Sequence, residues 1–285
     1  MKDLLTQRLS RYTLDTQQDE ERAIREMLQE IILYALHHAE FFHVAAFQGG
    51  TALRILHGLS RFSEDLDFAL KEPAIDFRIQ PYVDRAAESL NALGLTFELT
   101  GRDKGDNAVQ SRFLKHDSLG GLLELTFQYD PRKKISIKIE LDTHPPQGAV
   151  YEKRYHDFPL DFVLTAFDPP SLFAGKGHAL LCRTPAKGRD WYDFAWYIAQ
   201  QIPINAVLLQ HALHQFGPWH DQNIEVNSQW LTRAMREKIA ALDWVALAHD
   251  VRPMLRPQEQ AQLQLWSPEF FLEKLSKLHL QVSNE

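Results

Sequence analysis

The sequence has few of the features that mark secreted, membrane or zinc-binding proteins. It contains one cysteine, Cys182, so no internal disulfide can form. No apolar run approaches the length of a membrane span, and residues 1–22 are too charged for a signal peptide. The 13 histidines show no ligand spacing such as H-E-x-x-H. We therefore expect a soluble, cytoplasmic protein without membrane contact or a zinc site.

The excess of negative over positive charge is also small. The net charge of −7 on 285 residues argues against indiscriminate binding of nucleic acid, although it leaves room for a local basic surface. Basic residues gather in two clusters that are either solvated loops or a patch facing a polyanion. They are Arg102, Lys104, Arg112, Lys115, His116, Arg132, Lys133 and Lys134.

Apolar periodicity divides the chain into a mixed part and a helical part. Helices are expected at 19–41, 52–57 and 81–93, and strands at 43–47, 65–70, 95–100, 108–114, 122–129 and 135–141. Beyond residue 171 the pattern is helical, at 172–183, 191–200, 205–214, 229–247 and 268–278. This predicts an α+β fold: a mixed sheet with packed helices in a domain of residues 1–168, then a helical domain of residues 169–285.

The most informative stretch is QGGTALRILHGLSRFSEDLDFAL, residues 48–70. Asp65 and Asp67 lie two positions apart on a predicted strand and therefore share one face. Two adjacent carboxylates repel each other unless a cation lies between them, and hard oxygen ligands of this kind suit Mg²⁺. The Gly49–Thr51 turn at a helix start offers backbone N–H groups to phosphates. The stretch predicts a nucleoside-triphosphate site.

Gly-Gly-Thr followed by a short helix and Arg61-x-Ser63-x-Asp65-Leu-Asp67-Phe resembles the AbiEii/AbiGii nucleotidyltransferase-toxin family, within the DNA polymerase β-like nucleotidyltransferases. The resemblance implies Mg²⁺ or Mn²⁺ as cofactor and an NTP such as ATP or CTP as co-substrate. It also implies an RNA acceptor, with the 3′ end of tRNA as the candidate, and an antitoxin protein as partner of a growth-arresting toxin.

A second motif lies in residues 135–142, ISIKIELD, where every odd-numbered residue is apolar and every even-numbered residue is polar. The polar face therefore carries Lys138, Glu140 and Asp142 together. The family places a third carboxylate near the Asp-x-Asp strand, to take a proton from the attacking hydroxyl or to hold the metal. Resemblance to its Lys-Ile-Glu-Leu string makes Glu140 the candidate, with Asp142 as the alternative.

The third motif resembles a helix of the form L-x-x-x-K-x-x-A-x-x-x-R at residues 172–183. Lys176 and Arg183 lie two turns apart on one helical face, where both could neutralise a triphosphate. Gly175 and Gly177 beside the lysine weaken a helix. Either a phosphate approaches the backbone closely there, or the helix begins later than predicted.

The fourth motif, R-D-x-x-D, comprises Arg189, Asp190 and Asp193, which in the family complete the nucleotide pocket. Asp190 could instead be a helix N-cap. Ser63, two residues before Asp65, could orient its loop; alternatively, a phosphate placed on it would repel the incoming triphosphate.

These motifs give one set of expected site residues. The expected catalytic residues are Asp65, Asp67, Glu140, Lys176 and Asp193, and the expected metal ligands are Asp65, Asp67 and Glu140. The residues expected to bind the nucleotide are Gly49, Gly50, Thr51, Ser63, Lys176, Arg183, Arg189 and Asp190. Two alternatives remain: a nucleotidyltransferase acting on a small molecule such as an antibiotic, and a non-catalytic binding protein of the same fold.

Overall fold

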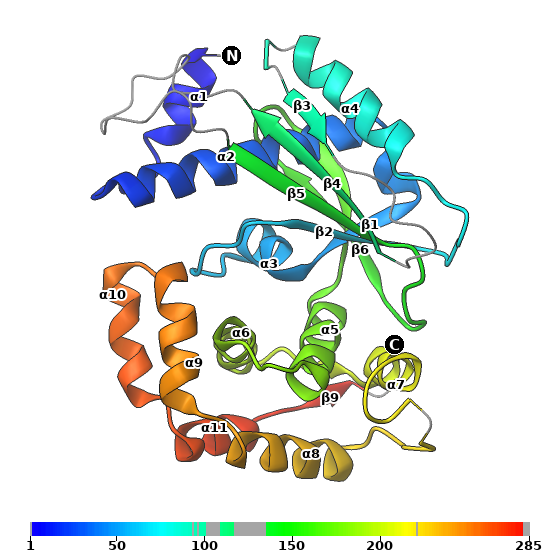
Figure 1. Cartoon of the computed structure of the whole chain (residues 1–285), viewed down its shortest axis with the longest axis vertical. Helices are drawn as coiled ribbons and strands as arrows, with labels where there is room; N and C mark the ends of the chain where they lie inside the picture. Colours follow the sequence, from blue (N-terminus) through cyan, green and yellow to red (C-terminus); the bar gives the residue numbers. More distant parts are fainter. Residues whose placement is uncertain are drawn as a thin grey trace. The chain divides into compact units, whose positions relative to one another are not determined.

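A computed structural model describes residues 2–92, 94–95, 97–100, 109–116, 135–220 and 222–281 (Figure 1). The chain divides into two compact units. The first unit comprises Met1–Leu56, Glu64–Pro145 and Lys153–Ala166, and the second comprises His57–Ser63, Pro146–Glu152 and Phe167–Glu285. Two short segments that precede residue 168, His57–Ser63 and Pro146–Glu152, thus belong to the second unit. Separate folding on either side of residue 168 stays a prediction.

The first unit is built on a seven-stranded mixed sheet of order β3-β4-β5-β2-β1-β7-β6. Within it, β2 pairs in parallel with β5 and β1 pairs in parallel with β7, whereas β1–β2, β3–β4 and β4–β5 are antiparallel. The strands are β1 (Ala45–Gln48), β2 (Leu66–Leu70), β3 (Phe97–Thr100), β4 (Val109–His116), β5 (Ile135–Asp142), β6 (Tyr151–His156) and β7 (Phe162–Phe167). This confirms the predicted α+β class with a mixed sheet.

Over the described residues, this sheet is accompanied by the helices α1 (Lys2–Leu9), α2 (Gln17–His38), α3 (Gly49–His57) and α4 (Gln80–Ala92). A capping box, in which Thr16 and Asp19 bond each other's backbone N–H groups, starts α2. Helix α2 packs against α4 and β5, and α4 packs against β3. The apolar side chains of β5 are buried, so its alternate residues, including Lys138 and Glu140, belong to the opposite face.

The second unit is helical, with one short two-stranded pairing of β8 (Ile204–Asn205) and β9 (Leu280–Gln281). Its core is aromatic: Trp191, Phe194, Trp244 and Phe271 are buried, and ring contacts join Trp191 to Phe194 and Trp244, and Trp244 to Phe271. The helices and 3₁₀ turns are α5 (Pro169–Cys182), α6 (Gly188–Ala199), α7 (Ala206–Gln215), α8 (Ser228–Ala240), α9 (Trp244–Val251), η3 (Arg252–Met254), α10 (Pro257–Gln260), η4 (Ala261–Leu265) and α11 (Pro268–Leu275).

The predicted elements differ from the structure at a few places. The helix expected at 229–247 is two helices, because Asp243 caps a new start by accepting from the Ala246 N–H. Strands β6 and β7 lie where no element was expected, and the strand expected at 122–129 falls outside the described residues. Throughout the described ranges, no helix combines the length and the apolarity that crossing a membrane requires.

Candidate active site

The strand pairing of the first unit brings two of the predicted carboxylates together. In the parallel register of β2 and β5, Asp67 lies opposite Glu140, whereas Asp142 lies opposite Ala69. Neighbouring strands run about 4.8 Å apart, and register partners in a parallel pair point to the same face. Glu140 is therefore the side-by-side neighbour of Asp67, and Asp142 lies two residues farther along the strand. Asp142 also accepts the backbone N–H of His144 at 2.8 Å.

One lysine lies among these carboxylates. Lys138 Nζ is 2.6 Å from Glu140 Oε1, which also accepts from the Ser111 hydroxyl at 3.2 Å. The hydrogen bond to Glu140 raises the pKa of Lys138 above its ordinary value against partial burial, and the charges of Glu140, Asp65 and Asp67 raise it further. We call Asp65, Asp67, Lys138 and Glu140 the carboxylate face. With three carboxylates and one ammonium, these four groups carry an excess of negative charge.

The glycine turn lies directly against this face. Helix α3 begins at Gly49, so Gly49, Gly50 and Thr51 form its first turn instead of preceding it as predicted. Gly49 has a φ of +78°, and a Cβ there would collide with the Asp67 carboxylate. The buried Thr51 hydroxyl donates to the backbone carbonyl of Asp65. Only glycine lets the start of α3 approach the carboxylate this closely.

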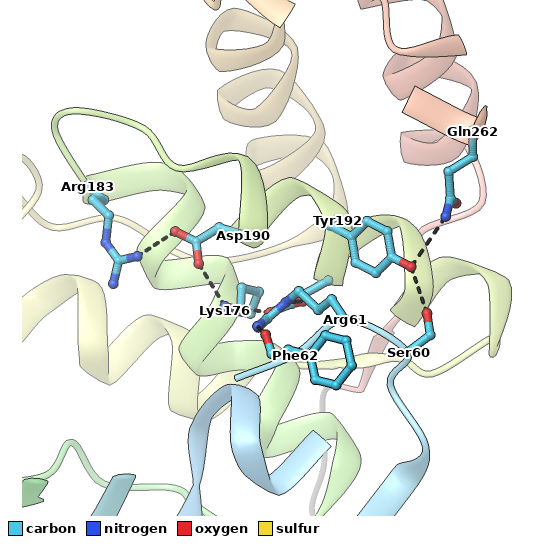
Figure 2. Close-up of polar contacts among 9 residues, drawn as sticks. Ser60, Arg61, Phe62, Lys176, Arg183, Asp190, Tyr192 and Gln262 are labelled. Atoms are coloured by element: carbon cyan, nitrogen blue, oxygen red, sulfur yellow. Dashed lines mark hydrogen bonds and ion pairs between the residues drawn. The ribbon is translucent and has the colours of Figure 1, made fainter. Parts of the chain in front are cut away.

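The second unit gathers the residues of the third and fourth motifs around Asp190 (Figure 2). Asp190 is 2% exposed; its Oδ1 accepts from Lys176 Nζ at 2.7 Å and its Oδ2 from Arg183 NH1 at 2.7 Å. The two cations therefore both reach Asp190, Lys176 from within α5 and Arg183 from its C-cap position. Asp190 is the third residue of α6 and its N-cap position is Lys187, so the alternative that Asp190 caps this helix is wrong.

Asp193 lies one turn later and is fully buried. It accepts two hydrogen bonds from Arg61, from Nε at 2.5 Å and from NH2 at 2.6 Å, and its Oδ2 is 2.8 Å from Lys176 Nζ. Burial alone would raise the pKa of Asp193, but Arg61 and Lys176 together hold it below its ordinary value. We call Arg61, Lys176, Arg183, Asp190 and Asp193 the ion-pair cluster.

The two glycines beside Lys176 have different surroundings. Both lie inside α5, so a later helix start does not explain them. A Cβ on Gly177 would lie 2.6 Å from Ile204 Cδ1, whereas a Cβ on Gly175 would meet nothing within 4 Å. Gly177 is thus needed for packing within the second unit, and Gly175 is not.

The remaining predicted residues are less tightly placed. Ser63 and Arg189 are both half-buried, Ser63 just before Glu64 and Arg189 in the first turn of α6. Of the expected basic patch, Arg112 is 2% exposed and bonds Gln80 Oε1 at 2.7 Å, so it cannot be a surface contact as predicted. The other members lie outside the described residues or have side chains that do: Arg102, Lys104, Lys115, His116, Arg132, Lys133 and Lys134.

Three contributors to these sites had no role predicted from the sequence. Lys138 was expected on the polar face only, although its i, i+2 spacing to Glu140 could have indicated their contact. Arg61 belongs to the first motif, but no partner was predicted for it. Ser111 reaches Glu140 from β4 and was not expected in the site. Only strand pairing reveals that last contact.

Comparison with known proteins identifies the family of this chain. The chain matches the family model described as nucleotidyl transferase AbiEii toxin, type IV toxin–antitoxin system, over residues 31–274. Among solved structures, one from H. pylori aligns with a TM-score of 0.50 at 18% identity, covering 92% of this chain and 99% of that one. No curated protein matches the chain.

A second solved structure, MenT4, a nucleotidyltransferase toxin from Mycobacterium tuberculosis, aligns with a TM-score of 0.48 at 17% identity, covering 98% of this chain and 99% of that one. At these identities, the likeness to the H. pylori structure shows a shared fold alone. The family match spans most of the sequence and includes all four motifs. The chain therefore belongs to the AbiEii nucleotidyltransferase toxins of type IV toxin–antitoxin systems.

Proposed function

We propose that this nucleotidyltransferase moves an NMP from an NTP to a hydroxyl of RNA, with Mg²⁺ held by Asp65 and Asp67. The observation that carries this proposal is the register of Asp67 with Glu140, beside the glycine turn of α3. Three carboxylates that face one lysine leave negative charge for a divalent cation to neutralise. This donor set of hard oxygens fits Mg²⁺.

Over the residues that the structure describes, no three His, Cys, Asp or Glu side chains form a ready metal cage. Mg²⁺ commonly takes only one or two carboxylates and completes its shell with water and substrate phosphates. Asp65 and Asp67 meet that requirement, and Glu140 would join them once Lys138 releases it. When bound, the ion would supply charge neutralisation for the triphosphate and the leaving pyrophosphate.

The chain's own groups would then perform distinct tasks. The first backbone N–H groups of α3 would hold the β- and γ-phosphates. Glu140 would accept the proton of the acceptor hydroxyl, whose oxygen forms a bond to the α-phosphorus while the bond to pyrophosphate breaks. Lys176 and Arg183 would add positive charge toward the phosphates, and Asp190 and Asp193 would orient these cations.

The test is transfer from each labelled NTP to total RNA by the purified protein, with Asp67→Ala as the inactive control. Mg²⁺-dependent labelling of RNA by the wild type alone supports the proposal. Affinity for RNA should also fall steeply as salt rises, because each phosphate contact releases counterions. No labelling of RNA with any NTP would contradict the proposed acceptor.

One observation favours a small-molecule acceptor instead. Arg112, an expected member of a basic track for RNA, is buried against Gln80. A salt-independent reaction with a small hydroxyl compound, together with unlabelled RNA, would select this second candidate. The family membership implies an antitoxin partner in either case.

A further inference from the structure

The segment His57–Ser63, which we call the strap, connects α3 with β2 but belongs to the second unit. Leu59, Arg61 and Phe62 are at most 9% exposed, so most of the strap is embedded among the helices of this unit. The Arg61–Asp193 pair belongs to the ion-pair cluster described above. The other contacts of the strap lie apart from that cluster and have no role in the chemistry so far (Figure 2).

The first of these contacts is a chain of hydroxyl and amide groups. Ser60 Oγ is 2.7 Å from Tyr192 Oη, and Gln262 Nε2 donates to the same Tyr192 oxygen at 3.3 Å. Burial raises the pKa of the Tyr192 phenol, so it keeps its proton at neutral pH. Because Gln262 donates a hydrogen bond to this oxygen, the Tyr192 O–H remains available to donate to Ser60.

The second contact is made two residues farther along the strap, at Phe62. The Phe62 backbone N–H donates to the Met254 carbonyl at 2.9 Å, and the Arg256 guanidinium carbon lies 5.8 Å from the centre of the Phe62 ring. The strap is thus fixed by α6 and by the segment from η3 to η4. These elements are distant in sequence from both Asp65 and Asp67.

The peptide chain connects these contacts of the strap directly to the carboxylate face. Only Ser63 and Glu64 separate Phe62 from Asp65, a path of three residue steps that spans at most about 11 Å. The Phe62 N–H is held by Met254, and the Asp65 carbonyl is held by the Thr51 hydroxyl. A short peptide fixed at both ends transmits any displacement of the strap to Asp65.

We propose that Ser60, Tyr192 and Gln262 are positioning residues for nucleotide transfer, which hold the strap and thereby set the position of Asp65, the residue directly before β2. The kinetic test of this inference rests on the proposed function. The test by hydrogen exchange rests on the geometry of the strap alone. A purely structural role would instead lower stability without moving the Mg²⁺ requirement.

The chain offers a matched control on the same helix. Tyr197 is also buried in α6, and in the described part of the chain its hydroxyl has no hydrogen-bond partner. Tyr192→Phe and Tyr197→Phe therefore remove the same atom, but only the first removes the link to Ser60. Asn227→Ala, which deletes the N-cap of α8, provides a variant of the same unit with reduced stability and an intact strap.

The expected kinetic result is a selective loss. Tyr192→Phe and Ser60→Ala should each lower kcat about tenfold and raise the half-saturating Mg²⁺ concentration severalfold, with the KM for NTP changed less than twofold. The double variant should be no worse than either single one, since both remove one hydrogen bond. Ser60→Thr, which keeps the hydroxyl, should recover most of the kcat. Tyr197→Phe and Asn227→Ala should keep both constants.

Amide hydrogen exchange decides the same point without turnover. Peptides covering residues 58–68 should exchange faster in Tyr192→Phe than in Tyr197→Phe or Asn227→Ala. Equal exchange in all three variants overturns the inference, as does a Tyr192→Phe enzyme with wild-type kcat. A wild type inactive with every NTP refutes the proposed function instead, and exchange then decides the role of the strap.

Discussion

The carboxylate face and the ion-pair cluster are both built from carboxylates and cations, but the two regions differ in burial and in the balance of charge. In the carboxylate face, three half-exposed carboxylates meet one lysine. In the ion-pair cluster, two buried carboxylates meet three cations at distances of 2.5–2.8 Å. A charge imbalance open to solvent attracts an ion, whereas buried carboxylates that are fully paired fix the geometry of the cations around them. Function and stability should therefore respond separately to mutation in the two regions.

The largest expected effect is on activity, from the carboxylate face. Asp67→Ala should lower transfer at least about a thousandfold, because a metal ligand accounts for several kcal/mol of transition-state stabilisation. Its melting temperature should be nearly unchanged. The assay is incorporation of labelled NMP, with Asp142→Asn as the control on the neighbouring strand. Near-normal transfer by Asp67→Ala would mean that the site is assigned wrongly.

The next effect is on stability, from the ion-pair cluster. Arg61→Ala should lower the free energy of unfolding by about 3–5 kcal/mol, since it leaves the buried Asp193 carboxylate with one cation fewer. Urea denaturation measures this change. The control is Lys277→Ala, which breaks an exposed pair with Glu273 and should leave the unfolding midpoint in place. Equal midpoints for the two variants would show that the cluster does not stabilise the fold.

At acid pH, the contribution of Asp193 to the stability of the protein should become measurable. The pKa of folded Asp193 lies below its ordinary value, so its ionised form stabilises the protein above about pH 4 and this contribution is lost as the pH falls further. Asp193→Asn should thus start less stable and lose less stability below pH 4 than the wild type. Parallel curves of unfolding free energy against pH would contradict the assignment.

Substitutions at two glycines, one in each region, should have smaller effects that differ in kind. Gly49→Ala places a methyl group on the Asp67 carboxylate at a positive φ, so it should reduce transfer about a hundredfold or more, in the direction of Asp67→Ala. Gly175→Ala, beside Lys176 but facing open space, should raise stability by up to about 1 kcal/mol and keep activity. Loss of activity in Gly175→Ala would instead indicate that a phosphate approaches this backbone.

The smallest effect concerns the single lysine of the carboxylate face. Lys138→Met removes a competing charge from Glu140 and should lower the half-saturating Mg²⁺ concentration by about fivefold, as expected for roughly 1 kcal/mol of charge interaction. A titration of activity against Mg²⁺ measures this. A higher Mg²⁺ requirement would show that Lys138 orients Glu140 for the ion and does not compete with it.

Local pattern was enough to predict the face of each strand but not which strands are neighbours. The alternation in residues 135–142 correctly predicts that Glu140 lies opposite the apolar core. Its pairing with Asp67 depends on β5 lying beside β2, which no local feature of either segment encodes. The resemblance to the family, now confirmed by the family match, supplied that information before the structure did.

Long-range ion pairs were beyond sequence reasoning for the same reason. Arg61 and Asp193 are 132 positions apart, and nothing in either motif marks the other as its partner. Strand β6 was missed because its residues are half-buried or exposed at the edge of the sheet, so no strict alternation develops. By contrast, the second helix start at Asp243 carried a readable cap signal, and the error there was avoidable.

The five points at which the chain passes from one unit to the other have a practical consequence for dividing this toxin into fragments. A gene cut after residue 168 would deliver the helical fragment without Leu59, Arg61 and Phe62, so Asp193 would lose its guanidinium and the core would lose two apolar side chains. The helical fragment should therefore fold poorly alone. Two such fragments expressed from separate promoters should arrest growth only when both are present, which would make the pair a reporter of coincident expression.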